Sequence, residues 1–247
     1  MKHFAIRSRS VRREAPFTCP GLGDRIHSAL LAWQWSKGEP VTIHITDDKW
    51  SLAGGVLSDK KKKSWAEICK LFPGDVKVMA HNTQNLLEED WLHYLEIKGY
   101  AAQTYYYEDS LAMHPLDYKI GVDATGLLHK LPEIKASRPK GVEDLTDGTH
   151  IAYNLDSTDA NRMVDKAFFE RLTGGLKTIK ITGDMPLDKA GYIISTAKKY
   201  IGIDSGIFHL ATLYKSWKDI ELLSKNDGYK SHHLIRAIRN GTTITTT

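Results

Sequence analysis

The sequence predicts an α/β protein with two domains, each built around a parallel β-sheet. Short runs rich in β-branched residues alternate with segments whose apolar residues recur every three or four positions, which is the pattern of βαβ units. The alternation stops in a polar stretch with two prolines and two glycines, residues 131–149, and then starts again. The 247 residues, 41% hydrophobic and 26% charged, suffice for two compact cores. We therefore expect one domain over residues 1–140 and a second over residues 149–247.

The first predicted domain begins with a strand, a helix and a second strand. The helix is indicated by Ile26, Ala29, Leu30 and Trp33, whose spacing places them on one face. A second helix has the same spacing and stops at Pro73, because proline cannot continue a helix. The pattern predicts helices through residues 26–33, 65–72 and 87–95, and strands at residues 3–6, 41–45, 76–80, 104–107 and 118–122.

The second predicted domain repeats this plan. Apolar spacing predicts helices through residues 164–172 and 207–214, and short β-rich runs predict strands at residues 150–154, 178–182, 200–204 and 220–223. The threonine-rich tail, residues 241–247, is expected to fray.

Several classes of protein are excluded by composition. No apolar run approaches the roughly 20 residues of a membrane-spanning helix, and the N-terminus has no secretory signal pattern. We expect a chain that is free in the cytoplasm or peripheral to the inner face of the membrane. Cys19 and Cys69 are expected to be reduced thiols, and no metal site is predicted. A net charge of +4 is too small to indicate a nucleic-acid binder.

A glycine-rich loop precedes the first helix. Gly21 and Gly23 permit a tight turn, and Asp24 follows at the start of the helix, at the sheet edge where open α/β proteins bind ligands. Asp24 is either an N-cap, a structural role, or a general base. The loop also imitates a dinucleotide fingerprint, with Asp47 or Asp48 as the later carboxylate, but Ile26 occupies the position of the third glycine. The nicotinamide-binding alternative is therefore disfavoured.

A second loop lies within the segment from Tyr200 to Ala211, where a predicted strand ends at Asp204 and a helix begins at Ser205 and Gly206. Free amide groups and the positive end of the helix dipole favour a phosphate there. Asp204 would repel a bare phosphate, so we expect it to accept hydrogen bonds from sugar hydroxyls. His209, one turn into the helix, is either a phosphate contact or a packing residue.

The segments GLGDRIHSALLAW, residues 21–33, and YIGIDSGIFHLAT, residues 200–212, resemble glycosyltransferase family nine, the ADP-heptose:lipopolysaccharide heptosyltransferases. That family has the GT-B architecture, in which two Rossmann-like domains face each other across a cleft. The resemblance implies this fold, shortened at its C-terminal end, and an inverting enzyme that moves a sugar from a nucleotide-diphosphate donor to a hydroxyl. It implies no cofactor and no metal.

The resemblance also implies roles for single residues. Asp24 matches the aspartate that removes the proton of the acceptor hydroxyl, and Gly23 precedes it. The matching donor-binding residues are Asp204, Ser205, Gly206 and His209. The sequence departs from the family near Asn161, where a lysine is expected, and the neighbouring Arg162 is the candidate replacement cation.

The acceptor is inferred from a basic cluster beside Asp24. Its members are Arg7, Arg9, Arg12, Arg13 and Arg25. Arginine binds phosphate with a planar fork, so the cluster favours an anionic acceptor, unless it is only a solvated loop. We expect a lipopolysaccharide-type glycan or lipid. Two alternatives remain open: transfer to hydroxymethylated bases of DNA, and a catalytically idle protein that only binds nucleotide sugars.

Overall fold

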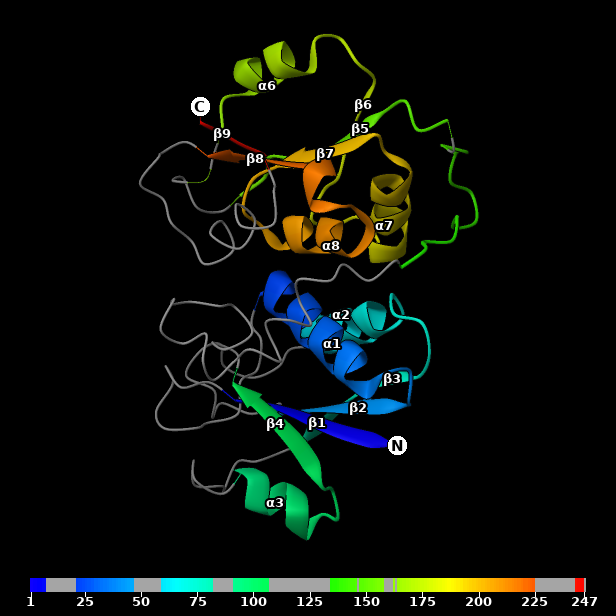
Figure 1. Ribbon diagram of the computed structural model, residues 1–247, viewed down its shortest axis with the longest axis vertical. Coiled ribbons are helices and arrows are strands. Elements are labelled where there is room, and N and C mark those ends of the chain that lie inside the picture. The colour runs from blue at the N-terminus through cyan, green and yellow to red at the C-terminus, as the bar shows by residue number, and fades with distance from the viewer. Residues whose placement is uncertain are drawn as a thin grey trace. The chain divides into compact units, whose positions relative to one another are not determined.

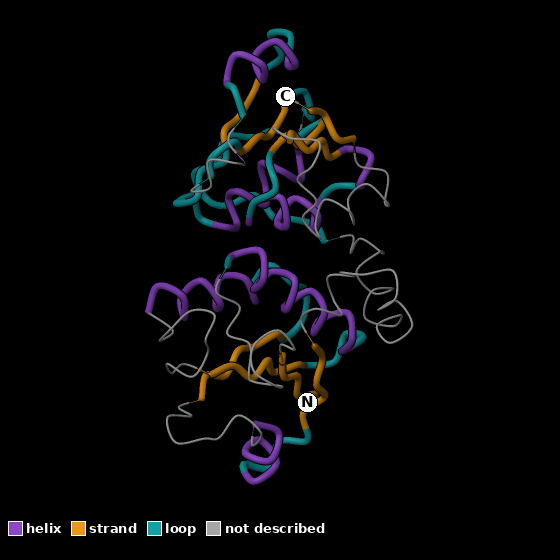
Figure 2. Tube along the Cα trace, turned by 90° about the vertical axis from the view of Figure 1, so that its left-hand side faces the viewer, coloured by secondary structure: helices purple, strands orange, loops and turns teal. Residues whose placement is uncertain are grey.

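The structure is a computed structural model, and it describes residues 1–7, 21–46, 59–81, 91–106, 134–145, 147–157, 162, 164–224 and 243–246. The chain divides into two compact units, Met1–Lys130 and Leu131–Thr247. Each unit is a parallel sheet with helices on both faces, as Figures 1 and 2 show. The predicted α/β class is therefore confirmed. The predicted division between residues 140 and 149 stays a prediction.

Unit 1 contains a four-stranded parallel sheet in the order β3-β2-β1-β4. Its strands are β1 (Lys2–Arg7), β2 (Val41–Thr46), β3 (Val76–His81) and β4 (Ala102–Tyr106). Its helices are α1 (Leu22–Ser36), α2 (Asp59–Cys69) and α3 (Trp91–Ile97). Helices α1 and α2 cover one face of the sheet, and α3 covers the other (Figure 1). Cys69 is a free thiol, and burial raises its pKa to about 12, so the thiol stays protonated.

Unit 2 contains a five-stranded parallel sheet in the order β6-β5-β7-β8-β9. Its strands are β5 (Ile151–Asn154), β6 (Thr178–Lys180), β7 (Lys199–Gly202), β8 (Ile220–Ser224) and β9 (Thr243–Thr246). Its helices are α6 (Lys166–Thr173), α7 (Leu187–Thr196), α8 (Gly206–Tyr214) and the short 3₁₀ helix Trp217–Asp219. Helices α7 and α8 lie on one face of the sheet and α6 on the other (Figure 1).

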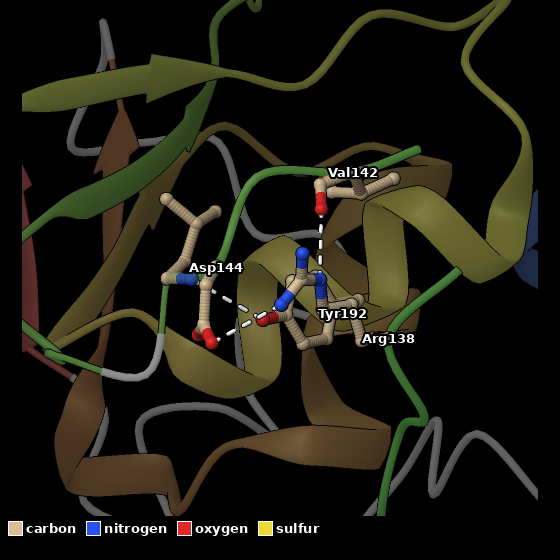
Figure 3. Close-up of polar contacts among 5 residues, drawn as sticks. Arg138, Val142, Asp144 and Tyr192 are labelled. Atoms are coloured by element: carbon tan, nitrogen blue, oxygen red, sulfur yellow. Dashed lines mark hydrogen bonds and ion pairs between the residues drawn. The ribbon is translucent and has the colours of Figure 1, made fainter. Parts of the chain in front are cut away.

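The polar stretch before β5 packs against α7. Arg138 donates hydrogen bonds to the carbonyl oxygen of Val142 at 2.8 Å and to the carboxylate of Asp144 at 3.1 Å. The backbone N–H of Leu145, a buried residue, donates to the hydroxyl of Tyr192 on α7 at 3.2 Å (Figure 3). The described part of this stretch is therefore held by specific contacts within unit 2.

The structure differs from the sequence predictions at several places. Helix α7 was not predicted, because Gly191 interrupts its apolar pattern and Pro186 precedes it. The tail was expected to fray, and this was wrong: β9 pairs with β8, and the hydroxyl of Thr245 donates to the buried carboxylate of Glu221 at 2.5 Å. Strand β4 begins two residues earlier than predicted. The strand predicted at residues 118–122 lies outside the described residues.

A row of three histidines crosses the face of the unit 1 sheet that α3 covers. His44 Nε2 lies 2.9 Å from His3 Nδ1, and His44 Nδ1 lies 2.8 Å from His81 Nε2. The ring of Tyr100 packs against all three imidazoles, and the hydroxyl of Tyr94 lies 3.5 Å from His81 Nδ1. Burial lowers the pKa of His44 to about 3, and the neighbouring His81 and His3 add to this effect. The buried position of the row therefore favours neutral imidazoles.

This arrangement predicts that unit 1 loses stability in acid. The pKa of His44 is about 3 in the folded protein, and its ordinary value in the unfolded chain is 6.5. Between these pH values the unfolded chain therefore binds more protons than the folded protein. The free energy of unfolding should then fall as the pH drops from 6.5, by up to about 1.4 kcal/mol per pH unit from His44. Urea titrations at several pH values measure this slope.

The variant His44→Gln should show a shallower pH slope, whereas His93→Gln, on the exposed surface of α3, should keep the wild-type slope. An unchanged slope in the His44 variant would contradict the role given to this imidazole.

Candidate functional site

The sheet of unit 2 reverses its strand order between β5 and β7. From β5 the chain passes through α6 to β6 on one side, and from β6 it passes through α7 to β7 on the other side of β5. Ligands of open α/β sheets bind outside the carboxyl ends of the strands at such a reversal. Asn154 and Gly202 are paired there, as the last residues of the two strands.

Asn154 joins three segments at this edge. Its Nδ2 donates to the carbonyl oxygen of Ile181, directly after β6, at 2.8 Å. Its Oδ1 accepts a hydrogen bond from the hydroxyl of Ser205 at 3.2 Å, and its backbone oxygen accepts one from the N–H of Ile203 at 3.2 Å. The side chain is buried, so these bonds are shielded from water. Asn154 thereby places the loop between β7 and α8 against the ends of β5 and β6.

Helix α8 begins in this loop with Gly206, and Ser205 is its N-cap residue. The Ser205 side chain does not cap the helix but turns to Asn154 instead. The first amide groups of a helix have no partner within the helix and lie at the positive end of its dipole. With glycine as the first helical residue, no side chain at that position hinders a ligand from approaching these amides. The helix begins where the sequence predicted it, and anion binding at this loop stays a prediction.

Asp204 and Arg162 lie together in the same loop region. Arg162 Nη1 donates to the backbone oxygen of Asp204 at 2.8 Å, although 42 positions separate the two residues. Asp204 is only 6% exposed, and neither carboxylate oxygen has a hydrogen-bond partner among the described residues. A buried carboxylate without partners is costly and calls for an explanation, such as a ligand that supplies the missing donors.

His209 lies one turn into α8 and is buried, with its ring 5.1 Å from that of Phe208. Its backbone oxygen accepts a hydrogen bond from the hydroxyl of Thr212 at 2.8 Å. The aromatic contact agrees with the packing alternative for this histidine. A phosphate contact through His209 stays a prediction.

The candidate base lies in unit 1, in the first turn of α1. Gly21 is the N-cap residue, and its N–H donates to Asp24 Oδ2 at 2.9 Å. A Cβ at Gly21 would lie 2.8 Å from this oxygen, so a larger residue there would displace the Asp24 carboxylate. Asp24 is therefore the third helical residue and not the N-cap, and Gly23 is inside the helix and not in a turn. Asp24 is partly exposed, whereas Arg25 is buried at 7% exposure.

Two comparisons with known proteins bear on this site. Residues 154–215, from the end of β5 to just past α8, match glycosyltransferase family 9 (heptosyltransferase). The chain resembles a family 9 glycosyltransferase. The whole fold is similar to that of E. coli ADP-heptose lps heptosyltransferase II, with a TM-score of 0.50 and 13% sequence identity over 99% of this chain and 90% of that one. No curated protein matches the chain.

The family 9 resemblance in the sequence is thus confirmed, and the family match over residues 154–215 supports a glycosyltransferase. Since the identity to the E. coli protein is low, that similarity shows the fold alone, which is the predicted GT-B fold with two Rossmann-like units. Among the described residues, no helix is long and apolar enough to cross a bilayer.

The structure brings together four of the residues predicted for this family 9-like donor site, namely Arg162, Asp204, Ser205 and Gly206. Asp24, Gly23 and Arg25 share the first turn of α1 in the other unit. Arg9, Arg12 and Arg13 lie outside the described residues, so the basic cluster stays a prediction. Asn154 was not predicted from the sequence as part of the site. Its position at the end of a predicted strand was the available signal.

Removing the Asn154 side chain should destabilise unit 2. Asn154→Ala leaves the carbonyl of Ile181 and the hydroxyl of Ser205 without their buried partner, so we expect a loss of about 1–3 kcal/mol in the free energy of unfolding. Ser205→Ala removes only the weaker of these bonds and should cost less than about 1 kcal/mol. Urea denaturation measures both values. Equal stability of Asn154→Ala and wild type would contradict the joining role.

Proposed function

We propose that the protein is an inverting glycosyltransferase that moves a sugar from a nucleotide-diphosphate donor to a hydroxyl group of an anionic acceptor. The observation that carries this proposal is the buried Asp204 carboxylate, which has no hydrogen-bond partner among the described residues and lies beside the start of α8. A phosphate alone would not satisfy it, because both groups are negative. A ligand with hydroxyl groups next to a diphosphate would satisfy both the carboxylate and the helix amides.

The donor is proposed to lie along unit 2, with its diphosphate at Ser205 and Gly206. The positive end of α8 and the guanidinium of Arg162 would stabilise the charge that develops on the leaving diphosphate. In this proposal they perform the role that a metal ion has in other glycosyltransferases, so the reaction needs no cofactor besides the donor. Arg162 would replace the lysine of the family.

Asp24 is proposed as the general base. It would accept the proton of the acceptor hydroxyl while that oxygen attacks the anomeric carbon, and the bond to the diphosphate would break from the opposite face of the sugar. The configuration at the anomeric carbon is then inverted. Its partial exposure leaves the side chain accessible from solvent, as a base for an incoming hydroxyl must be.

The acceptor is proposed to be a lipopolysaccharide-type glycan or lipid. The E. coli protein of similar fold is an ADP-heptose lps heptosyltransferase, which supports a nucleotide-diphospho-heptose donor and such an acceptor here as well. The arginine residues that precede Gly21 in the sequence would contact the phosphates of the acceptor.

Donor binding is the first test. A thermal-shift panel of ADP-, GDP-, UDP- and CMP-sugars should contain at least one compound that raises the midpoint of unfolding, because a ligand that binds only the folded state stabilises it. For that compound, Arg162→Ala should weaken binding about 10- to 100-fold, the expected loss of a charged hydrogen bond to phosphate. Calorimetry measures the dissociation constants.

The control variant is Arg171→Ala, which removes an exposed arginine from α6 and should bind the donor as the wild type does. Arg162→Lys should recover part of the lost affinity. A wild-type protein that binds none of these sugars would contradict the proposed function, whereas binding without transfer to any hydroxyl acceptor would favour the idle binding protein.

The variant Asp24→Asn should separate binding from chemistry. It removes the base while leaving unit 2 unchanged, so donor affinity should be retained and the transfer rate should fall about 10²- to 10⁴-fold. The matched control is Asp188→Asn in the first turn of α7, which removes another exposed carboxylate near a helix N-terminus. Transfer assays with both variants give the comparison, and a fully active Asp24→Asn would exclude this residue as the base.

A further inference from the structure

Tyr200 has a buried hydroxyl beneath the proposed donor loop. Tyr200 and Gly202 lie two residues apart on β7, so both face the same side of the sheet. The phenol extends over Gly202: a Cβ at that position would overlap the phenol ring and its oxygen and would lie 2.9 Å from the backbone oxygen of Asn154. The hydroxyl therefore reaches the carboxyl ends of β5 and β7, where the donor site is proposed.

The surroundings of this hydroxyl are site residues. Burial raises the pKa of Tyr200, the hydroxyl of Ser205 acts in the opposite direction, and the charge of Asp204 adds to the increase. The side chain is fully buried, yet its oxygen makes no hydrogen bond of standard geometry among the described residues. A phenylalanine would fill the same space without the cost of burying an unpaired hydroxyl.

We propose that Tyr200 is a positioning residue of the donor site, and that its hydroxyl donates a hydrogen bond to Ser205 Oγ when a donor binds. This inference rests on the proposed function. Ser205 already donates to Asn154 Oδ1, and Asn154 donates to the carbonyl of Ile181. The added bond would complete a chain of hydrogen bonds that strengthen one another and hold the first turn of α8 toward the diphosphate.

The chain of hydrogen bonds links residues from four segments of unit 2. Tyr200 comes from β7, Ser205 from the start of α8, Asn154 from β5, and Ile181 follows β6. Ser205 is already a neighbour of the phenol, since its hydroxyl acts on the pKa of Tyr200. Tyr200 would thus act on the donor through Ser205, without touching it.

The test compares two tyrosine variants of the full-length chain. Tyr200→Phe should unfold at the same temperature as the wild type or higher, because it removes a buried hydroxyl that makes no hydrogen bond of standard geometry among the described residues. It should bind the tightest of ADP, GDP and UDP about tenfold more weakly. Calorimetry and thermal unfolding give both readouts, and in transfer assays the change should appear in KM and not in kcat.

The matched control is Tyr192→Phe on α7, which removes the buried hydroxyl that accepts a hydrogen bond from the N–H of Leu145 (Figure 3). This variant should unfold at a lower temperature and bind the diphosphate as the wild type does.

Two results in the variants would overturn the inference. One is wild-type affinity of Tyr200→Phe, and the other is a parallel loss of stability and affinity, which would make the hydroxyl a structural group of the free protein. A wild-type protein that binds no nucleoside diphosphate and no nucleotide sugar would instead overturn the proposed function, and the inference with it. The two failures are distinguishable because the first is measured on the Tyr200→Phe variant and the second on the wild type.

Discussion

The proposed donor site depends on the hydrogen bonds that Asn154 makes between the ends of neighbouring strands. Parallel strands bring their carboxyl ends to one edge, but that alone leaves the following loops free to take different directions. The amide of Asn154 bonds to the segment after β6 and to the start of α8 at once, and its backbone bonds to the loop after β7. Because both strand ends are tied together, Arg162 and Asp204 meet at a defined place despite their distance in sequence.

Buried polar groups in unit 2 fall into two kinds. Glu221 is buried but paired, since it accepts hydrogen bonds from Lys199 and Thr245 and so attaches the last strand to the sheet. Asp204 and Tyr200 are buried with no hydrogen bond of standard geometry to their side-chain oxygens among the described residues. The Tyr200 hydroxyl reaches the end of β7, and Asp204 follows that end by two residues. Paired groups hold the fold together, whereas unpaired ones lower its stability. Their position at one strand end is the reason for assigning them to ligand binding.

Several elements were predictable because their signals are local. The apolar spacing of α1 and α8, the β-branched run of β2 and the short apolar run of β8 depend only on neighbouring residues, and all four were predicted. Helix α7 was missed because Gly191 weakens its pattern. The structure supplies the reason: a Cβ there would lie 2.8 Å from the ring of Tyr214, so glycine allows α7 and α8 to pack closely. The pairing of β9 was equally invisible, since threonines alone do not indicate which strand edge is open.

The sequence by itself determined the α/β class, the loop of Asp204, Ser205 and Gly206, and the resemblance to a glycosyltransferase family. These are short-range patterns, in which the residue types and their spacing carry the information. Only the tertiary structure decided that Arg162 lies against Asp204, that Asn154 joins the strand ends, and that the hydroxyl of Tyr200 lies beneath the loop. These contacts arise from strand order and side-chain packing between segments distant in the chain, which no local pattern records.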